Sequence, residues 1–193
     1  MANDIEQKQK IIYAATRLFS RFGLEKTTMG DIAKAAKKGK SSLYYYFKSK
    51  EEVFAEVIKK EIAGLNTAII EAIETEDDPY NKFRKFVDSR LNYLNEKADQ
   101  YTNVKDEHLK HYEFVENLTA DYSKWEISTI KNIVGYGRDK GLFEVTDLDS
   151  ISQALFFALK GLEYPWTINL TRKEIEKSVD ALVDVLLRGI SKR

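Results

Sequence analysis

Two stretches near the N-terminus decide the fold of this chain: IIYAATRLFSRFGLEKTTMGDIAKAA at residues 11–36 and SSLYYYFKSKEEVF at residues 41–54. In the first stretch, apolar side chains recur at the spacing of one helix face, and Gly23 predicts where that helix ends. Thr28 is followed three residues later by Asp31. This is the spacing of a capping box, and it predicts a second helix that ends near residue 36.

The second stretch predicts a third short helix at residues 41–47, because Leu43 and Phe47 are four residues apart and can both face a core. Helical periodicity continues through the rest of the chain, and no segment alternates as a strand would. The further helices that it predicts lie at residues 49–74, 79–97, 102–117, 119–140, 147–165 and 172–189. The sequence therefore predicts an all-α protein of about nine helices, with one domain at residues 1–48 and a larger one at residues 49–193.

The composition favours a soluble intracellular protein. The chain has 193 residues and is 43% apolar, which allows one substantial core or two small ones. It contains no cysteine, so disulfides and thiolate metal sites are excluded and a reducing cytoplasm is expected. No apolar run reaches the roughly 18 residues that a membrane span needs. The polar N-terminus lacks the apolar core of a signal peptide.

The formal charge is zero overall but is unevenly distributed. Residues 1–60 hold 13 Lys/Arg and 7 Asp/Glu, whereas residues 61–193 hold 18 and 24. Six lysines and no acid lie between residues 34 and 50, around three consecutive tyrosines. A local excess of positive charge indicates a polyanionic partner, although an ordinary solvated face would give the same pattern.

The three short helices have the layout of a helix-turn-helix unit, whose last helix enters the major groove of DNA. Such a helix needs basic side chains for phosphates, and polar or aromatic ones for base edges and sugars. Side chains of these types lie in the third predicted helix or directly before it: Lys40, Ser41, Ser42, Tyr44 and Tyr45. The sequence therefore favours DNA as the polyanion.

Together the two stretches closely resemble the DNA-binding domain of the tetracycline-repressor (TetR) family of bacterial transcription regulators. The matching positions keep the family's order and spacing: Ala14-Ala15, Leu18-Phe19, Gly23, Thr27-Thr28, Ile32-Ala33, Leu43-Tyr44, Phe47, Lys50 and Glu51. The rest of the chain resembles the family only in being a helical domain of suitable length. The resemblance implies a repressor that binds a palindromic operator as a homodimer and is released by a small-molecule effector.

The resemblance also implies roles for individual residues. Thr28 is expected to cap the second helix near a phosphate, and Lys50 to grip a phosphate at the start of the fourth helix. The residues expected to contact base edges are Lys40, Ser41 and Ser42. Tyr44 and Tyr45 are expected to contact the sugar-phosphate backbone or the edge of the groove.

The turn before the recognition helix departs from the family pattern. Lys37, Lys38 and Gly39 stand where the family usually has Gly, an apolar residue and Ser. Ser41 and Tyr46 also differ from the family, which often has Gly and His there. We expect the turn glycine to have moved by two positions, from the place of Lys37 to Gly39. Lysine adopts a positive φ less readily than glycine does. We also expect Lys37 and Lys38 to lie where the phosphates of DNA would be. The turn would then lose the buried contact of the family's apolar residue and gain contacts with phosphates.

The larger domain is expected to hold an effector and a dimer interface. The resemblance implies that helices four to seven surround a ligand pocket and that helices 147–165 and 172–189 form a two-fold bundle. Thr146 and Asp149 predict a capping box at the start of the first of these. Both helices are amphipathic, although their stripes could also simply close the monomer core. The residues expected at the pocket are Tyr112, Trp125, Tyr136, Phe157, Gly161, Tyr164 and Trp166, although aromatic side chains at helical spacing are more often core.

Other functions receive less support. A metal-compatible spacing occurs at Asn103, Asp106, Glu107, His108 and His111, but such a group on a surface helix is more often solvated, so no metal or cofactor is expected. The G-x-S-x-G and phosphate-loop motifs are absent, and GYGRDKG at residues 135–141 follows no strand, so no enzyme is expected. The alternative is a sequence-independent architectural DNA-binding protein, which would bind every duplex with similar affinity.

Overall fold

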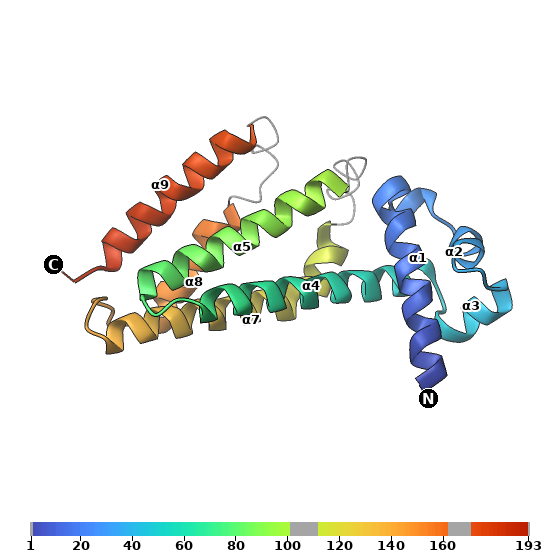
Figure 1. Ribbon diagram of the computed structural model, residues 1–193, viewed down its shortest axis with the longest axis horizontal. Coiled ribbons are helices and arrows are strands. Elements are labelled where there is room, and N and C mark those ends of the chain that lie inside the picture. The colour runs from blue at the N-terminus through green and yellow to red at the C-terminus, as the bar shows by residue number, and fades with distance from the viewer. Residues whose placement is uncertain (1, 101–111, 162–170, 193) are drawn as a thin grey trace. The chain divides into compact units, whose positions relative to one another are not determined.

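The computed structural model describes residues 2–100, 112–161 and 171–192. The α-helices in these ranges are α1 (Ala2–Lys26), α2 (Met29–Ala35), α3 (Lys40–Tyr46), α4 (Lys50–Glu74), α5 (Pro79–Gln100), α7 (Tyr112–Asp139), α8 (Leu148–Lys160) and α9 (Arg172–Ile190) (Figure 1). The same ranges contain no strand, only an isolated antiparallel bridge between Phe143 and Ser191. The all-α prediction is therefore confirmed. None of these helices is long and apolar enough to cross a membrane.

The chain divides into two compact units. The first consists of Met1–Thr67 and Leu91–Ala120, and the second of Ala68–Arg90 and Asp121–Arg193. Three long helices, α4, α5 and α7, therefore contribute residues to both units. The N-terminal helix α1 and the two short helices α2 and α3, with the first turns of α4, form what we call the head (Figure 1).

The head has its own apolar core. Leu43 and Phe47 of the recognition segment are 0% and 1% exposed, which confirms the prediction that both face inward. The ring of Phe19 meets that of Phe54 edge-on, with centroids 5.2 Å apart. The buried members of this core are Ile11, Ile12, Ala15, Phe19, Leu24, Met29, Ile32, Ala33, Leu43, Phe47, Val53 and Val57. Side chains from all four helices thus hold α3 in place.

The start of α2 is a capping box, as the spacing of Thr28 and Asp31 predicts. The Asp31 N–H donates to Thr28 Oγ1 at 3.2 Å, and the Thr28 N–H donates to Asp31 Oδ2 at 3.0 Å. Gly23, with φ 79°, interrupts α1 just before this cap. Its left-handed backbone is one that glycine adopts without a steric penalty, so the chain can turn from α1 into α2.

The turn between α2 and α3 is a Schellman motif with a lysine in the left-handed position. The Lys38 N–H donates to the Ala33 carbonyl at 2.8 Å, and the Lys37 N–H donates to the Lys34 carbonyl at 3.1 Å. Lys37 has φ 54°, whereas Gly39 has φ −70° and precedes α3 as its N-cap. The expectation that the turn glycine has moved is therefore wrong. The two hydrogen bonds keep the backbone of the turn, and Lys37 adopts the conformation that glycine would adopt more readily.

Replacement of Lys37 by glycine should stabilise the protein. We expect Lys37→Gly to raise the free energy of unfolding by about 1 kcal/mol, because the left-handed backbone no longer crowds a Cβ atom. Lys38→Gly is the matched control: it removes the neighbouring lysine at a position without a positive φ and should lower stability through chain entropy. Denaturant titration of both variants measures the difference, and a loss of stability in Lys37→Gly would contradict the assignment of strain.

In the second unit, the glycine-rich segment at residues 135–141 serves packing and the end of α7. A Cβ at Gly137 would overlap the ring of Phe143, so only glycine lets that ring lie against the helix. Gly141 has φ 72° and closes a second Schellman motif, in which the Leu142 N–H donates to the Gly137 carbonyl at 2.9 Å.

The helix α7 runs without a break through residue 118, so the predicted boundary between helices 102–117 and 119–140 is wrong. No glycine or proline between residues 112 and 134 ends the helix.

The caps of α8 and α9 differ from the prediction. The cap of α8 is Asp147, whose carboxylate accepts from the Ser150 N–H at 3.1 Å, so the capping box at Thr146 is wrong by one residue. The aspartate stands three residues before the N–H that it caps, as the geometry of an N-cap requires. The cap of α9 is a full box between Thr171 and Glu174, which sequence analysis missed. The region of helix 147–165 beyond Gly161 lies outside the described residues.

One buried ion pair stands in the core of the second unit. Arg90 on α5 donates through Nε to Glu126 Oε1 on α7 at 2.5 Å, and the two side chains are 7% and 1% exposed. Its apolar neighbourhood includes fully buried Phe83, Phe86 and Ile130 on the same two helices. The pair therefore joins α5 to α7 inside an apolar core.

Candidate functional site

The recognition segment α3 presents to solvent the side chains that sequence analysis assigned to DNA. Tyr44 and Tyr45 are 52% and 78% exposed. Lys40 and Ser41 are exposed as well, and Ser42 is half-buried. Because Leu43 anchors the opposite face in the core, the helix holds these five side chains on one outward surface.

The exposed edge of α2 lies beside the start of α3. A Cβ placed on Gly30 would lie 3.0 Å from Cε of Lys40 and 3.5 Å from Oγ1 of Thr28. The lysine stem therefore passes close to the α2 backbone, and Thr28 and Lys40 share one edge of the head. Hydrogen bonds from the side chain and backbone of Thr28 lower the pKa of Asp31, so the capping carboxylate is ionised at neutral pH.

Lys50 is engaged inside the head. Its Nζ donates to the carbonyls of Leu24 and Glu25 at 2.8 and 3.2 Å, which ties the start of α4 to the chain just after the interruption at Gly23. An ammonium group has three donors, so one is left for the predicted phosphate. The phosphate contact of Lys50 stays a prediction, and its internal hydrogen bonds are a role that sequence analysis missed.

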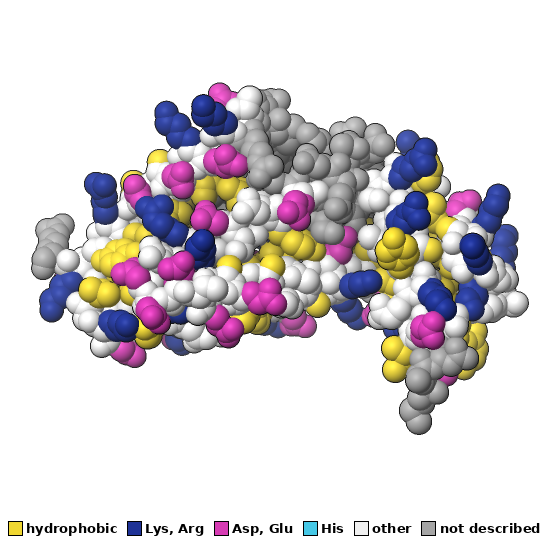
Figure 2. Space-filling view, viewed as in Figure 1, with side chains coloured by type: hydrophobic (Ala, Val, Ile, Leu, Met, Phe, Trp, Pro, Cys, Tyr) yellow, Lys and Arg dark blue, Asp and Glu magenta, His cyan; other side chains and the backbone are white. Residues whose placement is uncertain are grey.

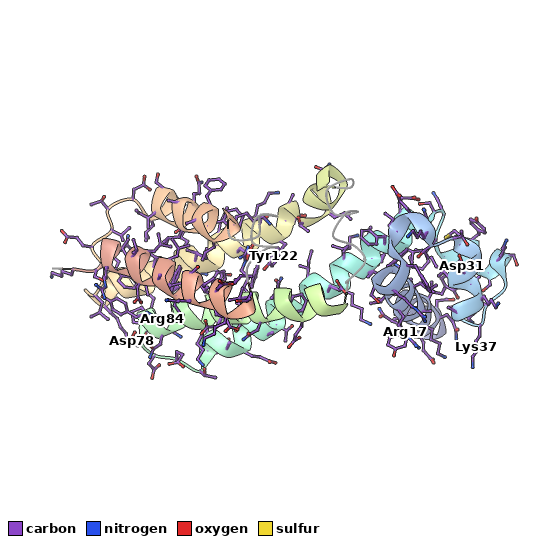
Figure 3. The ribbon with its side chains drawn as sticks, turned by 90° about the horizontal axis from the view of Figure 1, so that it is seen from above. Arg17, Asp31, Lys37, Asp78, Arg84 and Tyr122 are labelled. Carbon is purple, nitrogen blue, oxygen red and sulfur yellow. The ribbon has the colours of Figure 1, made fainter. Side chains whose placement is uncertain are left out.

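The two lysines of the turn have different surroundings. Lys37 is exposed and points outward from the head, where Figure 3 labels it, whereas Lys38 is half-buried. The hydrogen bond and charge of Lys10 lower the pKa of Glu6, and the charge of Lys38 adds to this effect. A carboxylate on α1 therefore offsets part of the charge of Lys38. The phosphate contacts of both lysines stay predictions.

The charge asymmetry of the sequence is visible on the head. Figure 2 shows Lys and Arg side chains gathered over the visible face of α1, α2 and α3, with few acidic side chains among them. Arg17 on α1, labelled in Figure 3, is another exposed basic side chain of the head. A surface of this kind attracts the phosphate backbone of DNA without reading its sequence.

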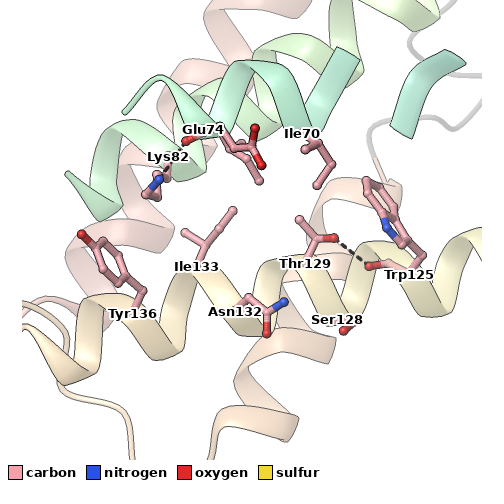
Figure 4. A pocket seen from close by; sticks show the side chains of 10 residues that line it. Ile70, Glu74, Lys82, Trp125, Ser128, Thr129, Asn132, Ile133 and Tyr136 are labelled. Carbon is pink, nitrogen blue, oxygen red and sulfur yellow. Dashed lines mark hydrogen bonds between the residues drawn. The ribbon is translucent and has the colours of Figure 1, made fainter. Parts of the chain in front are cut away.

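The second unit contains a cavity of about 330 Å³. Its walls come from the last turn of α4, the first turn of α5 and one face of α7 (Figure 4). The lining residues are Ile70, Ile73, Glu74, Lys82, Trp125, Ser128, Thr129, Asn132, Ile133 and Tyr136. Two of them, Trp125 and Tyr136, were expected at a pocket from the sequence. The others follow the helical spacing of α7 or come from the ends of α4 and α5, which the aromatic pattern alone does not indicate.

The remaining pocket predictions do not converge on this cavity. Phe157 is 66% exposed on α8, and Gly161 at the end of α8 does not line the cavity either. The side chains of Tyr112, Tyr164 and Trp166 lie outside the described residues, as does the group from Asn103 to His111. Within the part of the chain that the structure describes, no three potential metal-ligating side chains cluster.

The last two helices carry exposed apolar side chains. Phe157 on α8 and Val185 on α9 are 66% and 68% exposed. Small residues stand near them on the outward faces: Ala154 on α8, and Ala181 and Gly189 on α9. Small residues allow two helices to approach closely, so these faces have the composition of a helix-packing surface.

Comparison with known proteins places the strongest similarity in the head. A family model described as "Bacterial regulatory proteins, tetR family" matches residues 11–57. The Staphylococcus aureus (strain Newman) "Biofilm operon icaADBC HTH-type negative transcriptional regulator IcaR" is 43% identical over 63 residues, which cover 33% of this chain and 34% of that protein. The residues that the family model matches thus include α2, α3 and the turn between them.

Similarity also extends along the whole chain. The Escherichia coli (strain K12) "Probable acrEF/envCD operon repressor" is 26% identical over 195 residues, covering 97% of this chain and 88% of that protein. The crystal structure of a transcriptional regulator from Cytophaga hutchinsonii ATCC 33406 is 25% identical, with a TM-score of 0.74, and covers 94% of this chain and 97% of that one. The larger helical region is therefore shared as well as the head.

Proposed function

This chain belongs to the TetR family of bacterial regulatory proteins and is a DNA-binding transcriptional regulator, and we propose that it represses its target genes as a homodimer on a palindromic operator. The observation that carries this proposal is the outward surface of α3, with Tyr44 and Tyr45 exposed and Leu43 held in the core. A repressor is favoured because the similar Escherichia coli and Staphylococcus aureus proteins are named as negative regulators. Because bacterial DNA lies in the cytoplasm, we place the protein there.

On the operator, α3 enters the major groove. Lys40, Ser41 and Ser42 then reach base edges, and Tyr44 and Tyr45 contact the sugar-phosphate backbone at the rim of the groove. Thr28, on the same edge of the head as Lys40, contacts a phosphate, and Lys50 adds a phosphate contact through its remaining donor. The assignment is supported by the exposed positions of Thr28, Lys40, Ser41, Tyr44 and Tyr45, whereas Ser42 and Lys50 are half-buried.

The homodimer forms through α8 and α9. The exposed Phe157 and Val185, together with the small residues around them, support a symmetric four-helix contact between two copies. Two heads then present two recognition helices to two half-sites of the operator, so the symmetry of the protein predicts a palindrome.

An effector bound in the cavity of the second unit would release the operator. Ile70, Ile73 and Glu74 line the cavity at the end of α4, and Val53 and Val57 of the same helix belong to the core of the head. A ligand that binds better to one position of α4 than to another shifts the population of the dimer. Binding of effector and of operator then weaken each other by the same factor.

The turn lysines give a test of the DNA surface. We expect Lys37→Gln to reduce the slope of log affinity against log salt by about 0.9, the value for one lost phosphate contact. Lys38→Gln, the matched control, should change the slope less, because Glu6 already offsets the charge of Lys38. Filter-binding or anisotropy titrations between low and physiological salt measure both slopes. An unchanged slope in both variants would show that neither lysine of the turn contacts a phosphate.

Selection of duplexes from a random pool tests the proposed function itself. The purified full-length protein should enrich one palindrome whose half-sites are separated by about one helical turn or a multiple of it. A control protein with Lys40, Ser41 and Ser42 replaced by alanine should lose the enrichment while it keeps its fold, because these side chains are not core. A pool that stays random with the unmodified protein would overturn the assignment of sequence-specific repression.

A further inference from the structure

The shape of the cavity in the second unit restricts the size of its ligand. Its volume of about 330 Å³ lies at the lower end of the range of roughly 300–1,000 Å³ for small-molecule sites. Trp125 and Tyr136 stand at its two ends, three turns apart on α7, which corresponds to about 16 Å along the helix axis (Figure 4). Between them, Ile70, Ile73 and Ile133 give apolar walls. The space is open to solvent where the exposed Glu74, Ser128 and Asn132 line it, and its volume fits a molecule of one or two rings.

The aromatic side chains leave ring surface for such a molecule. Trp125 is half-buried and stacks on Tyr122 with one face, at a centroid distance of 5.8 Å and an interplanar angle of 19°. Trp125 also lines the cavity, so its indole contributes an aromatic wall that a ligand can contact. Stacked or edge-on aromatic pairs contribute about 0.5–1.5 kcal/mol beyond their buried area.

The charges around the cavity disfavour an ionic ligand. Lys82 already donates to the Ile73 carbonyl at 2.8 Å, and its Nζ lies 5.7 Å from the centroid of the Tyr136 ring. Lys140 lies 4.7 Å from the same centroid, so a cationic ligand at this ring would meet two ammonium groups.

An anion meets opposition at the same end of the cavity. The carboxylate of Glu74 lines the cavity, and Asp77 and Asp78 lie close enough to Lys140 to raise its pKa, after the larger effect of its hydrogen bond to Tyr136. Three carboxylates therefore stand around two ammonium groups. Lys82 keeps two of its three donors, but an anion beside it would also meet the negative charge of Glu74, and a cation beside Glu74 would also meet Lys82. Because both signs are present at this end of the cavity, neither sign of ligand gains a net attraction.

Neutral polar groups remain to orient the ligand. Ser128 and Asn132 line the α7 edge of the cavity, where a hydroxyl and an amide offer both donors and acceptors (Figure 4). Thr129 is less available, because its hydroxyl donates to the Trp125 carbonyl at 2.9 Å. We infer that the cavity binds a neutral one- or two-ring aromatic compound bearing hydroxyl or carbonyl groups. This inference rests on the proposed function for its regulatory meaning but not for the binding itself.

Three naphthalene probes of similar size and different charge test the inference on the full-length protein. Calorimetric titration at neutral pH compares 2-naphthol, which is neutral, with 2-naphthoate and 2-naphthylmethylammonium. We expect 2-naphthol to bind at least about tenfold more tightly than either ion, a difference of about 1.4 kcal/mol. Ile70→Trp fills the cavity from a position that is 36% exposed, and should abolish the binding of 2-naphthol without loss of fold.

A charge variant gives a second reading that does not depend on filling the cavity. Glu74→Gln removes one carboxylate from the wall, so it should strengthen the binding of 2-naphthoate and leave that of 2-naphthol unchanged. Tighter binding of either ion than of 2-naphthol, or no binding of any probe, would overturn the inference. Binding of 2-naphthol that persists in Ile70→Trp would also overturn it.

The same probes separate this inference from the proposed function. Release of the operator is measured independently, by anisotropy of labelled duplex in the presence of saturating 2-naphthol. Binding at the cavity without release would support the ligand class and count against release by this cavity. Failure to select a palindrome would overturn the proposed function and leave the calorimetric result intact.

Discussion

Loss of the Glu126 carboxylate should lower the free energy of unfolding by about 3–5 kcal/mol, which is the expected effect of breaking a buried ion pair. In Glu126→Ala, the guanidinium of Arg90 keeps its position among apolar side chains and loses the carboxylate 2.5 Å from its Nε. Both partners are less than one-tenth exposed, so water cannot replace the missing charge without entering the core. Urea titration of the full-length protein, followed by far-UV circular dichroism, measures the loss.

A double variant separates the charge from the volume. Arg90→Met combined with Glu126→Leu removes both charges and keeps most of the side-chain volume, so it should be close to the unmodified protein in stability. The exposed pair Lys124 and Asp121 on the same helix is the control: Asp121→Ala should change the free energy of unfolding by less than about 1 kcal/mol. Equal effects of Asp121→Ala and Glu126→Ala would contradict the structural role of the buried pair.

Disruption of the proposed dimer should weaken operator binding by about 10²–10⁴-fold, because each head then binds its half-site alone. Val185→Glu places a carboxylate at the centre of the outward face of α9, where the valine is 68% exposed. Two copies of that charge would meet across a two-fold axis and repel each other. Phe157→Glu should act in the same way from α8. Sedimentation and operator titration measure the two consequences separately.

Lys173→Glu is the matched control for this prediction. Lys173 is exposed in the first turn of the same helix but lies away from Val185 around its axis, so its reversal should leave the dimer intact. The head of Val185→Glu should keep its weak, salt-dependent affinity for any duplex, because the basic surface is untouched. A monomer that binds the palindrome as tightly as the unmodified protein would contradict the two-headed mode of binding.

Local signals in the sequence predict most of the fold. The capping box of Thr28 and Asp31, and the four-residue spacing of Leu43 and Phe47, depend on neighbours within one turn of helix, and the structure confirms both. The start of α5 follows the same logic, since Asp78 accepts from the Tyr80 and Asn81 N–H groups just before the first turn. Errors arose where two residues compete for one local role, as Thr146 and Asp147 do at the start of α8.

The turn at Lys37 shows a different limit. Propensity alone favours glycine at a positive φ, and Gly39 was the available candidate. The Schellman hydrogen bonds to Ala33 and Lys34 and the buried Leu43 instead fix the backbone, so the chain keeps its geometry with an unfavourable residue. Tertiary packing here outweighs the preference of one residue, which a reading of single positions does not predict.

A candidate site can be predicted from the sequence when its residues lie close together in the chain, and less well when they come from distant helices. The exposed residues of α3 follow from one short helix, whereas the cavity brings together Ile70, Lys82 and Trp125 from three helices. No spacing within one helix indicates that assembly. For the same reason Phe157, which its aromatic side chain alone suggested for the pocket, lies exposed on α8 instead. The internal hydrogen bonds of Lys50 also depend on a partner 25 or more residues away.

The central claim is that this protein binds one DNA sequence as a regulator, and the most direct measurement is an affinity ratio. The selected palindrome and a scrambled duplex of the same composition are titrated with the full-length protein at about 0.15 M salt. The proposed function predicts that the palindrome binds about 10³–10⁷-fold more tightly. Equal affinities with the same salt slope would contradict it, and would show that the lysines of the head bind phosphates alone.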